Sequence, residues 1–243
     1  MWKSEWRDFL NGIIDLLYPL YCLVCFKKIG SKEVFPLCSE CFQKIPWNIP
    51  PFCNKCGRNL PVELPSENIC LACKKERHYF DRAWSVALYE GVIRDCLHKF
   101  KYGQKLGLIN FFEKILSNFI EKFIAIEKFD YLIPVPLHPT KLRERGFNQA
   151  FLLAQPLAKK FQKKLLPRVL YRKKFTLPQS ELTASQRKRN IREAFLLRNQ
   201  PEISKKNILI IDDIFTTGST VDECAKLLKI NGAGVVEVLT VAR

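Results

Sequence analysis

The chain of 243 residues has three histidines, ten glycines, a single methionine and no long apolar run. A helix that spans a bilayer needs about 18 to 20 consecutive apolar residues, and no segment of the sequence supplies them. Near the amino terminus, Glu5, Asp8 and Asp15 interrupt the apolar stretch that a secretory signal requires. We therefore expect no membrane span and a cytoplasmic location.

Acidic residues are scarce relative to basic ones. The chain has 24 Asp and Glu against 40 Lys and Arg, a formal net charge of +16. This excess indicates a polyanionic partner, such as nucleic acid, a phosphate-rich ligand or an anionic membrane. Apolar residues make up 47% of the chain and charged residues 26%, which excludes a disordered or fibrous protein and indicates a globular one.

Eight of the ten cysteines form four C-x-x-C pairs, separated by 12, 11 and 13 residues. In a reducing compartment, such a cluster indicates metal binding rather than disulfides. Two C-x-x-C turns can close a tetrahedral shell of four thiolates around zinc and leave no open position, so the two zinc ions would be structural. The sequential assignment places Cys22, Cys25, Cys38 and Cys41 on one ion and Cys53, Cys56, Cys70 and Cys73 on the other. An interleaved cross-brace is the alternative.

The two remaining cysteines, Cys96 and Cys224, lie in helix-like segments, and we interpret them as small buried apolar residues.

The sequence patterns divide the chain into three parts. Residues 1–18 form an amphipathic helix that we expect to pack within the protein, residues 19–78 form the double zinc ribbon, and residues 79–243 form a second domain.

Strand-like and helix-like segments alternate in the second domain, which predicts an α/β fold with a mostly parallel sheet flanked by helices. We expect strands at 82–89, 131–136, 165–171, 207–212 and 235–242, and helices at 105–127, 147–162 and 219–231. In such sheets, ligands bind at the carboxyl ends of the strands.

One strand of this domain ends in two carboxylates and a loop of small residues, ILIIDDIFTTGST. Such a loop can surround a phosphate with backbone N–H groups at the start of the next helix, and Asp212 and Asp213 can hold sugar hydroxyls or hydrated Mg²⁺. The Walker A pattern is absent. The segment resembles the phosphoribosyl pyrophosphate (PRPP) loop of type I phosphoribosyltransferases. That resemblance implies that both aspartates contact the ribose, that Mg²⁺ binds with PRPP, and that the 5′-phosphate lies in a loop formed by Thr216, Thr217, Gly218, Ser219 and Thr220.

The order of motifs along the whole chain indicates a more specific family than the PRPP loop alone. Four cysteine pairs precede LYEGVIRDCLHKFKYG (88–103), PVPLHPTKLRERGFNQA (134–150), PQSELTASQRKRNIREAF (178–195) and the PRPP loop. This order resembles the competence protein ComF family, also called ComFC. The resemblance implies a cytoplasmic factor of natural transformation that handles incoming single-stranded DNA, with PRPP, a DNA-uptake helicase and other competence proteins as partners.

Two other functions stay open on the sequence alone. One is a phosphoribosyltransferase of nucleobase or nucleotide metabolism, and the other is a non-catalytic zinc-ribbon adaptor to a DNA-uptake helicase. Whether the chain catalyses PRPP-dependent glycosyl transfer is left undecided. His138 illustrates the point, because it fits either acid/base chemistry near pyrophosphate or the cap of a turn, and we favour the turn.

Most of the positive charge is concentrated in one span. Residues 141–206 contain 18 Lys and Arg and four acids, a net charge of +14. A run of charge can be a solvated face, but this span lies within the domain that carries the PRPP loop. The candidates for binding pyrophosphate or a DNA backbone are Lys141, Arg143, Arg145, Arg187, Lys188, Arg189 and Arg192.

Overall fold

The computed structural model describes residues 6, 20–29, 36–61, 68–102, 107–174, 193–198 and 203–243. Contacts between Cα atoms divide the chain into two compact units. The ribbon unit comprises residues 1–46 and 90–111, and the sheet unit comprises residues 47–89 and 112–243. The second cysteine quartet therefore lies in the same unit as the sheet, whereas the domain limits expected at 18 and 78 stay predictions.

The ribbon unit contains the first cysteine quartet. A short antiparallel pair, β1 (Leu20–Tyr21) and β2 (Lys28–Ile29), is followed by α2 (Ser39–Gln43) and, later in the chain, by α4 (Gly91–Tyr102). Apart from Trp6, which is helical and exposed, the helix expected over residues 1–18 lies outside the described residues.

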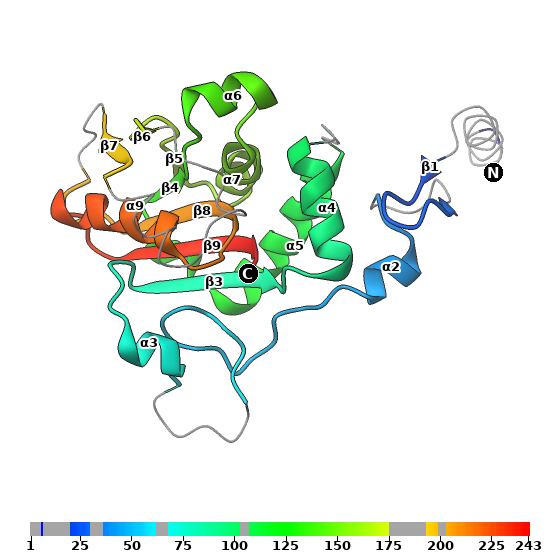
Figure 1. The fold of residues 1–243 in the computed structure, drawn as a ribbon, viewed down its shortest axis with the longest axis horizontal. Helices are drawn as coiled ribbons and strands as arrows, with labels where there is room; N and C mark the ends of the chain where they lie inside the picture. The colour runs from blue at the N-terminus through cyan, green and yellow to red at the C-terminus, as the bar shows by residue number, and fades with distance from the viewer. Residues whose placement is uncertain are drawn as a thin grey trace. The chain divides into compact units, whose positions relative to one another are not determined.

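The sheet unit is built on a parallel sheet of five strands in the order β3-β9-β8-β4-β5 (Figure 1). This confirms the α/β fold. The strands are β3 (Arg82–Ala87), β4 (Tyr131–Pro134), β5 (Lys164–Leu165), β8 (Ile208–Ile214) and β9 (Val236–Ala242). Every residue of β9 is buried, as expected for a central parallel strand covered on both faces.

Two helices cross between neighbouring strands and cover the sheet. The helix α7 (Gln149–Lys160) joins β4 to β5, and α9 (Ser219–Ile230) joins β8 to β9, in the opposite direction across the sheet. Because such crossovers are right-handed, the two helices lie on opposite faces. Figure 1 shows α9 alongside β8 and β9. The segment expected as one helix at 105–127 forms α5 (Leu108–Phe123) and a 3-10 turn, η1 (Ile126–Lys128).

Several short elements differ from the sequence expectations. The prediction of a single strand at 165–171 is wrong. β5 ends before Pro167, and the next strand, β6 (Leu170–Arg172), does not belong to the five-stranded sheet. Proline has no N–H to continue a strand ladder. β6 instead pairs antiparallel with β7 (Phe195–Leu197). Three short helices, α2, α3 (Leu71–Lys75) and α6 (Pro139–Arg145), were also not expected.

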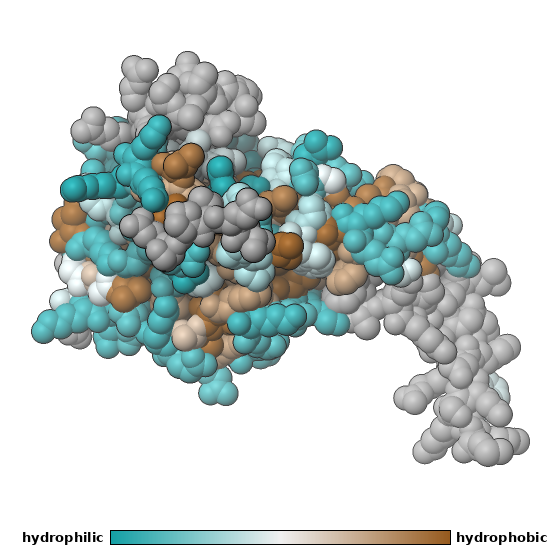
Figure 2. Space-filling view, turned by 90° about the horizontal axis from the view of Figure 1, so that it is seen from below, coloured by the Kyte–Doolittle hydropathy of each residue, from teal (hydrophilic) through white to brown (hydrophobic). Residues whose placement is uncertain are grey.

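On the face shown in Figure 2, hydrophobic residues form small patches between hydrophilic ones. No described helix combines the length and the apolar character that crossing a bilayer requires.

Candidate functional site

The structure brings the eight paired cysteines together as two quartets in the sequential order. One quartet is Cys22, Cys25, Cys38 and Cys41, and the other is Cys53, Cys56, Cys70 and Cys73. Within each quartet, the sulfur atoms lie within 4.8 Å of one another. Zinc–sulfur bonds of about 2.3 Å in a tetrahedron place the sulfurs about 3.8 Å apart. The Sγ atoms of Cys25 and Cys38 are 3.5 Å apart, and those of Cys56 and Cys70 are 3.7 Å apart. Both quartets therefore fit structural zinc.

The first cysteine of each quartet is prepared to act as a thiolate ligand. Burial raises the pKa of Cys22, but hydrogen bonds from backbone N–H groups outweigh it and lower the pKa to about 6. For Cys53, burial is likewise outweighed by backbone N–H groups, that of Cys70 foremost, and the pKa falls to about 7. The Cys70 N–H donates to the Cys53 Sγ at 3.4 Å. These donors favour the deprotonated sulfur that zinc binding requires.

The second quartet is built against the sheet. Gly57, which follows Cys56, has a φ of 68°, and a Cβ there would lie 2.2 Å from the carbonyl oxygen of Ala83 in β3. Only glycine allows this approach. The Ala83 N–H donates to the Lys55 carbonyl oxygen at 2.7 Å, and the Asn48 side chain donates to the carbonyl oxygens of Gly57 and Ser85 at 2.8 and 2.9 Å. The second C-x-x-C turn is thus fixed directly on β3.

The two candidate ribose-binding carboxylates both lie within β8, because the strand continues past Asp212 to Ile214. Successive side chains of a strand point to opposite faces. Asp212 shares a face with Ile210, which packs in one cluster with Cys224 of α9, whereas Asp213 points to the other face and is 8% exposed. The Asp213 N–H donates to the Asp212 Oδ1 at 2.9 Å. Both carboxylates therefore lie at the carboxyl end of the strand but face opposite sides of the sheet.

The loop between β8 and α9, residues 216–220, is the candidate phosphate cradle. Gly218 has a φ of 76° and is the N-cap of α9, and its carbonyl oxygen accepts the Asp222 N–H at 2.8 Å. The hydroxyls of Thr217 and Ser219 are hydrogen-bonded to each other at 2.8 Å, while Thr216 is exposed. Glycine contributes no side-chain cap, and an anion at the start of a 12-residue helix is favoured by its N–H groups and dipole.

Basic residues of α6 follow the neighbouring strand. β4 pairs with β8 so that Pro134 lies opposite Ile211, and the carboxyl ends of the two parallel strands share one edge. Asn148 joins the following helix to this edge: its side chain donates to the Val135 carbonyl oxygen at 3.0 Å and accepts the Ala150 N–H at 3.1 Å. Of the basic candidates, α6 carries Lys141, Arg143 and Arg145.

The other four candidates cannot be placed: Arg187, Lys188, Arg189 and Arg192 lie outside the described residues. His138 is the N-cap of α6, where its Nδ1 accepts the Thr140 N–H at 3.2 Å. This contact agrees with the turn-capping interpretation of His138.

Arg172 is a charged neighbour of Asp212 that the sequence did not single out. Burial lowers the pKa of this guanidinium, whereas the charges of Cys224 and Asp212 raise it and that of Arg145 lowers it again. Arg172 lies in β6, whose pairing with the distant β7 has no local sequence signal.

The two unpaired cysteines are buried in helices, as the sequence indicated. Cys96 in α4 and Cys224 in α9 both have 0% exposure. Burial raises the pKa of Cys96 to about 12 and that of Cys224 well above its usual range. Neither thiol is prepared to act as a nucleophile.

Two protein-family models match separate parts of the chain. Residues 13–74 match the family "Double zinc ribbon domain", and residues 148–243 match "Phosphoribosyl transferase domain". Among solved structures, adenine phosphoribosyltransferase from Saccharomyces cerevisiae is 19% identical, with a TM-score of 0.36 over 57% of this chain and 71% of that chain.

Relatives match over most of the chain. The DNA utilization protein YhgH of Salmonella typhimurium is 30% identical over 94% of this chain and 99% of its own length. Competence protein F of Haemophilus influenzae is 28% identical over 91% of this chain and 90% of its own length. Competence protein ComFC of Bacillus subtilis is 31% identical over 59% of this chain and 56% of its own length. The chain therefore belongs to the family of competence protein F, ComFC and YhgH, with a double zinc ribbon and a phosphoribosyltransferase domain.

Proposed function

We propose that this protein binds PRPP with Mg²⁺ at the β8–α9 loop and handles incoming single-stranded DNA in the cytoplasm during natural transformation. The observation that supports PRPP binding is the loop itself. Two carboxylates at the end of β8, the left-handed Gly218 and the start of a long helix occur within eight residues. The start of the helix can bind the 5′-phosphate, and the carboxylates at the end of the preceding strand can accept hydrogen bonds from the ribose. The names of the relatives, competence protein and DNA utilization protein, support the link to DNA.

In this proposal, each part of the site binds rather than reacts covalently. Because Asp212 and Asp213 point to opposite faces at the carboxyl end of β8, the ribose lies beyond the end of the strand, where both carboxylates can accept hydrogen bonds from its hydroxyls. The backbone of residues 216–220 cradles the 5′-phosphate. Bound Mg²⁺ would neutralise charge on the pyrophosphate. Lys141, Arg143 and Arg145 lie on the element that follows β4 and supply positive charge for pyrophosphate or a DNA backbone. Fixed charges of this kind stabilise an oxocarbenium-like ribosyl centre without a nucleophile from the protein.

PRPP turnover distinguishes the proposed function from its two alternatives. We expect PRPP to bind only with Mg²⁺ and its affinity or pyrophosphate release to respond to single-stranded DNA, measured by calorimetry and a pyrophosphate assay. Pyrophosphate release that needs a free nucleobase and ignores DNA would instead indicate a phosphoribosyltransferase of nucleobase metabolism. Absence of PRPP binding under all these conditions would contradict the proposal and favour the zinc-ribbon adaptor.

Binding of single-stranded DNA should depend steeply on salt, because basic side chains release counterions from the phosphates. Each phosphate contact contributes about −0.7 to the slope of log affinity against log salt for a single strand. Reversing two charges, Arg187→Glu with Arg189→Glu, should flatten the slope by roughly one to two units. The measurement is fluorescence anisotropy with a labelled oligonucleotide over a salt series. An unchanged slope and affinity would reject this DNA-binding assignment.

A further inference from the structure

The guanidinium of Arg243 lies between the second cysteine quartet and the phosphate cradle. Its backbone is fixed at the end of β9, where its N–H donates to the Ala87 carbonyl oxygen at 3.1 Å and its carbonyl oxygen accepts the Tyr89 N–H at 2.7 Å. With both backbone groups bonded to the chain at the end of β3, the side chain starts from a defined position.

On one side, the Arg243 guanidinium contacts two atoms of Cys56, a candidate zinc ligand. One guanidinium nitrogen donates to the Cys56 carbonyl oxygen, and the other lies 3.8 Å from the Cys56 Sγ. The planar fork of arginine suits such a two-point contact, which the single ammonium of lysine cannot reproduce. Cys56 is 6% exposed, so the contact is largely shielded from water. Zinc bound to Cys56 would therefore also fix the position of the guanidinium.

On its other side, the same guanidinium contacts the loop. Its central carbon lies 5.4 Å from the centre of the Phe215 ring, within the range of a cation–π interaction. Phe215 is 4% exposed and begins the loop directly after β8. Its N–H donates to the Ala242 carbonyl oxygen at 2.8 Å, and the edge of the Phe80 ring packs against it with the ring centres 5.9 Å apart.

The Phe215 ring supports the residue that shapes the phosphate cradle. A Cβ on Gly218 would lie 2.6 Å from the Phe215 Cζ, so the tip of the ring packs directly against the glycine. Gly218 in turn holds the left-handed conformation that starts α9. Displacing the Phe215 ring would therefore remove the surface against which Gly218 and its neighbours are ordered.

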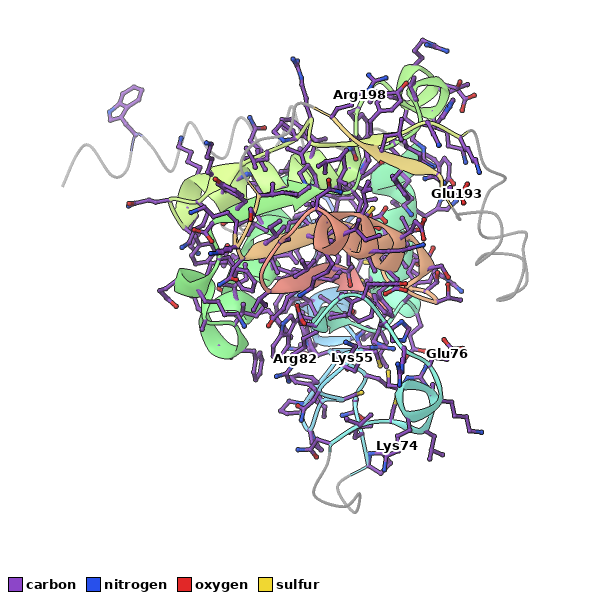
Figure 3. The ribbon with its side chains drawn as sticks, turned by 90° about the vertical axis from the view of Figure 1, so that its left-hand side faces the viewer. Lys55, Lys74, Glu76, Arg82, Glu193 and Arg198 are labelled. Atoms are coloured by element: carbon purple, nitrogen blue, oxygen red, sulfur yellow. The ribbon has the colours of Figure 1, made fainter. Side chains whose placement is uncertain are left out.

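Besides Arg243, a second cation, Lys55, approaches the aromatic rings beside the loop. Lys55 lies in the C-x-x-C turn between Cys53 and Cys56. Its Nζ lies 5.5 Å from the centre of the Phe80 ring, the ring that packs on Phe215. Figure 3 shows Lys55 on the side of the sheet unit that carries the second quartet, whereas Arg198 lies on the far side of the sheet. The path from the metal site to the loop thus consists of Cys56, Arg243, Phe215 and Gly218.

We propose that Arg243 is a positioning residue that joins the second zinc site to the phosphate cradle, so that zinc bound there keeps the loop in its ligand-binding shape. The identity of the ligand rests on the proposed function. The link itself concerns only residues of this chain and holds whether or not PRPP turns over.

Amide hydrogen exchange of the zinc-loaded protein tests the link without any ligand. In Arg243→Gln, we expect residues 215–219 to exchange about fivefold to thirtyfold faster than in the wild type. Exchange in β4 and α7 should be unchanged, and the variant should keep two zinc ions. The matched control is Arg198→Gln, which removes an arginine that stacks 3.6 Å from the Tyr171 ring centre and should leave the loop unaffected.

Two results would overturn the role of Arg243. One is equal exchange of residues 215–219 in Arg243→Gln and the wild type. The other is a uniform acceleration across the sheet unit, which would mean general stabilisation only. Should Arg243→Gln fail to fold, Arg243→Lys is the deciding variant: faster loop exchange supports the forked contact, and wild-type exchange contradicts it.

PRPP titration separates this inference from the proposed function. If the wild type binds PRPP with Mg²⁺, we expect Arg243→Gln to weaken the affinity by a factor similar to its loop acceleration, and an unchanged affinity would count against the link. If the wild type binds no PRPP, the proposed function fails, and hydrogen exchange alone still decides whether Arg243 orders the loop.

Discussion

Replacing both aspartates of β8, Asp212→Asn with Asp213→Asn, is expected to weaken Mg²⁺-dependent PRPP binding at least about 100-fold. A hydrogen bond to a charged group contributes about 1.5 to 3 kcal/mol, and two of them account for two or more powers of ten in affinity. The measurement is calorimetric titration of PRPP with and without Mg²⁺. The fold should persist, because asparagine has nearly the same shape as aspartate.

Two exposed carboxylates provide the control for this change in charge. Asp95 and Glu121 make surface ion pairs with Arg94 and Lys160, and their side chains are 46% and 52% exposed. Asp95→Asn with Glu121→Gln removes the same number of negative charges and should leave PRPP affinity within about twofold, because such surface pairs contribute little. Equal affinity in the β8 double variant and the wild type would reject the assignment of Asp212 and Asp213.

Loss of the second zinc site should destabilise the sheet unit. We expect Cys53→Ser with Cys56→Ser to reduce the zinc content from two ions to one and to lower the melting temperature by about 10 °C. Cys53 is fully buried, and it packs in one hydrophobic cluster with Phe80 and Ala83. A loss of about 4 kcal/mol, less than structural zinc contributes in small peptides, gives a shift of this size in a protein of this length.

The first quartet supplies the matched comparison. Cys22→Ser with Cys25→Ser also removes one zinc ion, but these residues lie in the ribbon unit. We expect the melting transition of the sheet unit to stay in place, as followed by circular dichroism alongside zinc analysis by mass spectrometry. The same loss of melting temperature in both double variants would show that the second quartet has no special role in the sheet unit.

The zinc ligands and the parallel sheet were predictable because their signals are local or periodic. A C-x-x-C turn fixes two thiols through the covalent chain, so the spacing of Cys53 and Cys56 already indicated one half of a metal shell. The alternation of apolar strands with helices indicated a sheet covered on both faces. The sequential grouping of the quartets was the simplest expectation, and the sulfur positions confirm it.

The sequence located the β8–α9 loop as the candidate phosphate cradle but missed part of its geometry. The strand was expected to stop at Asp212, whereas hydrogen bonding to β9 continues it to Ile214. That extension turns Asp212 and Asp213 toward opposite faces, because a strand alternates its side chains. A pairing partner 28 residues later in the chain, Thr240 opposite Asp212, decides this orientation, and no local pattern shows it.

The sequence by itself determined which residue types are available: eight thiols in pairs, a DD…TTGST loop, and a net charge of +14 over residues 141–206. Only the tertiary structure decided which side chains far apart in the sequence contact one another. Arg243 reaches Cys56 across 187 positions and Phe215 across 28. Such contacts depend on strand order and side-chain packing, and these are set by burial of the whole sheet rather than by neighbouring residues in the chain.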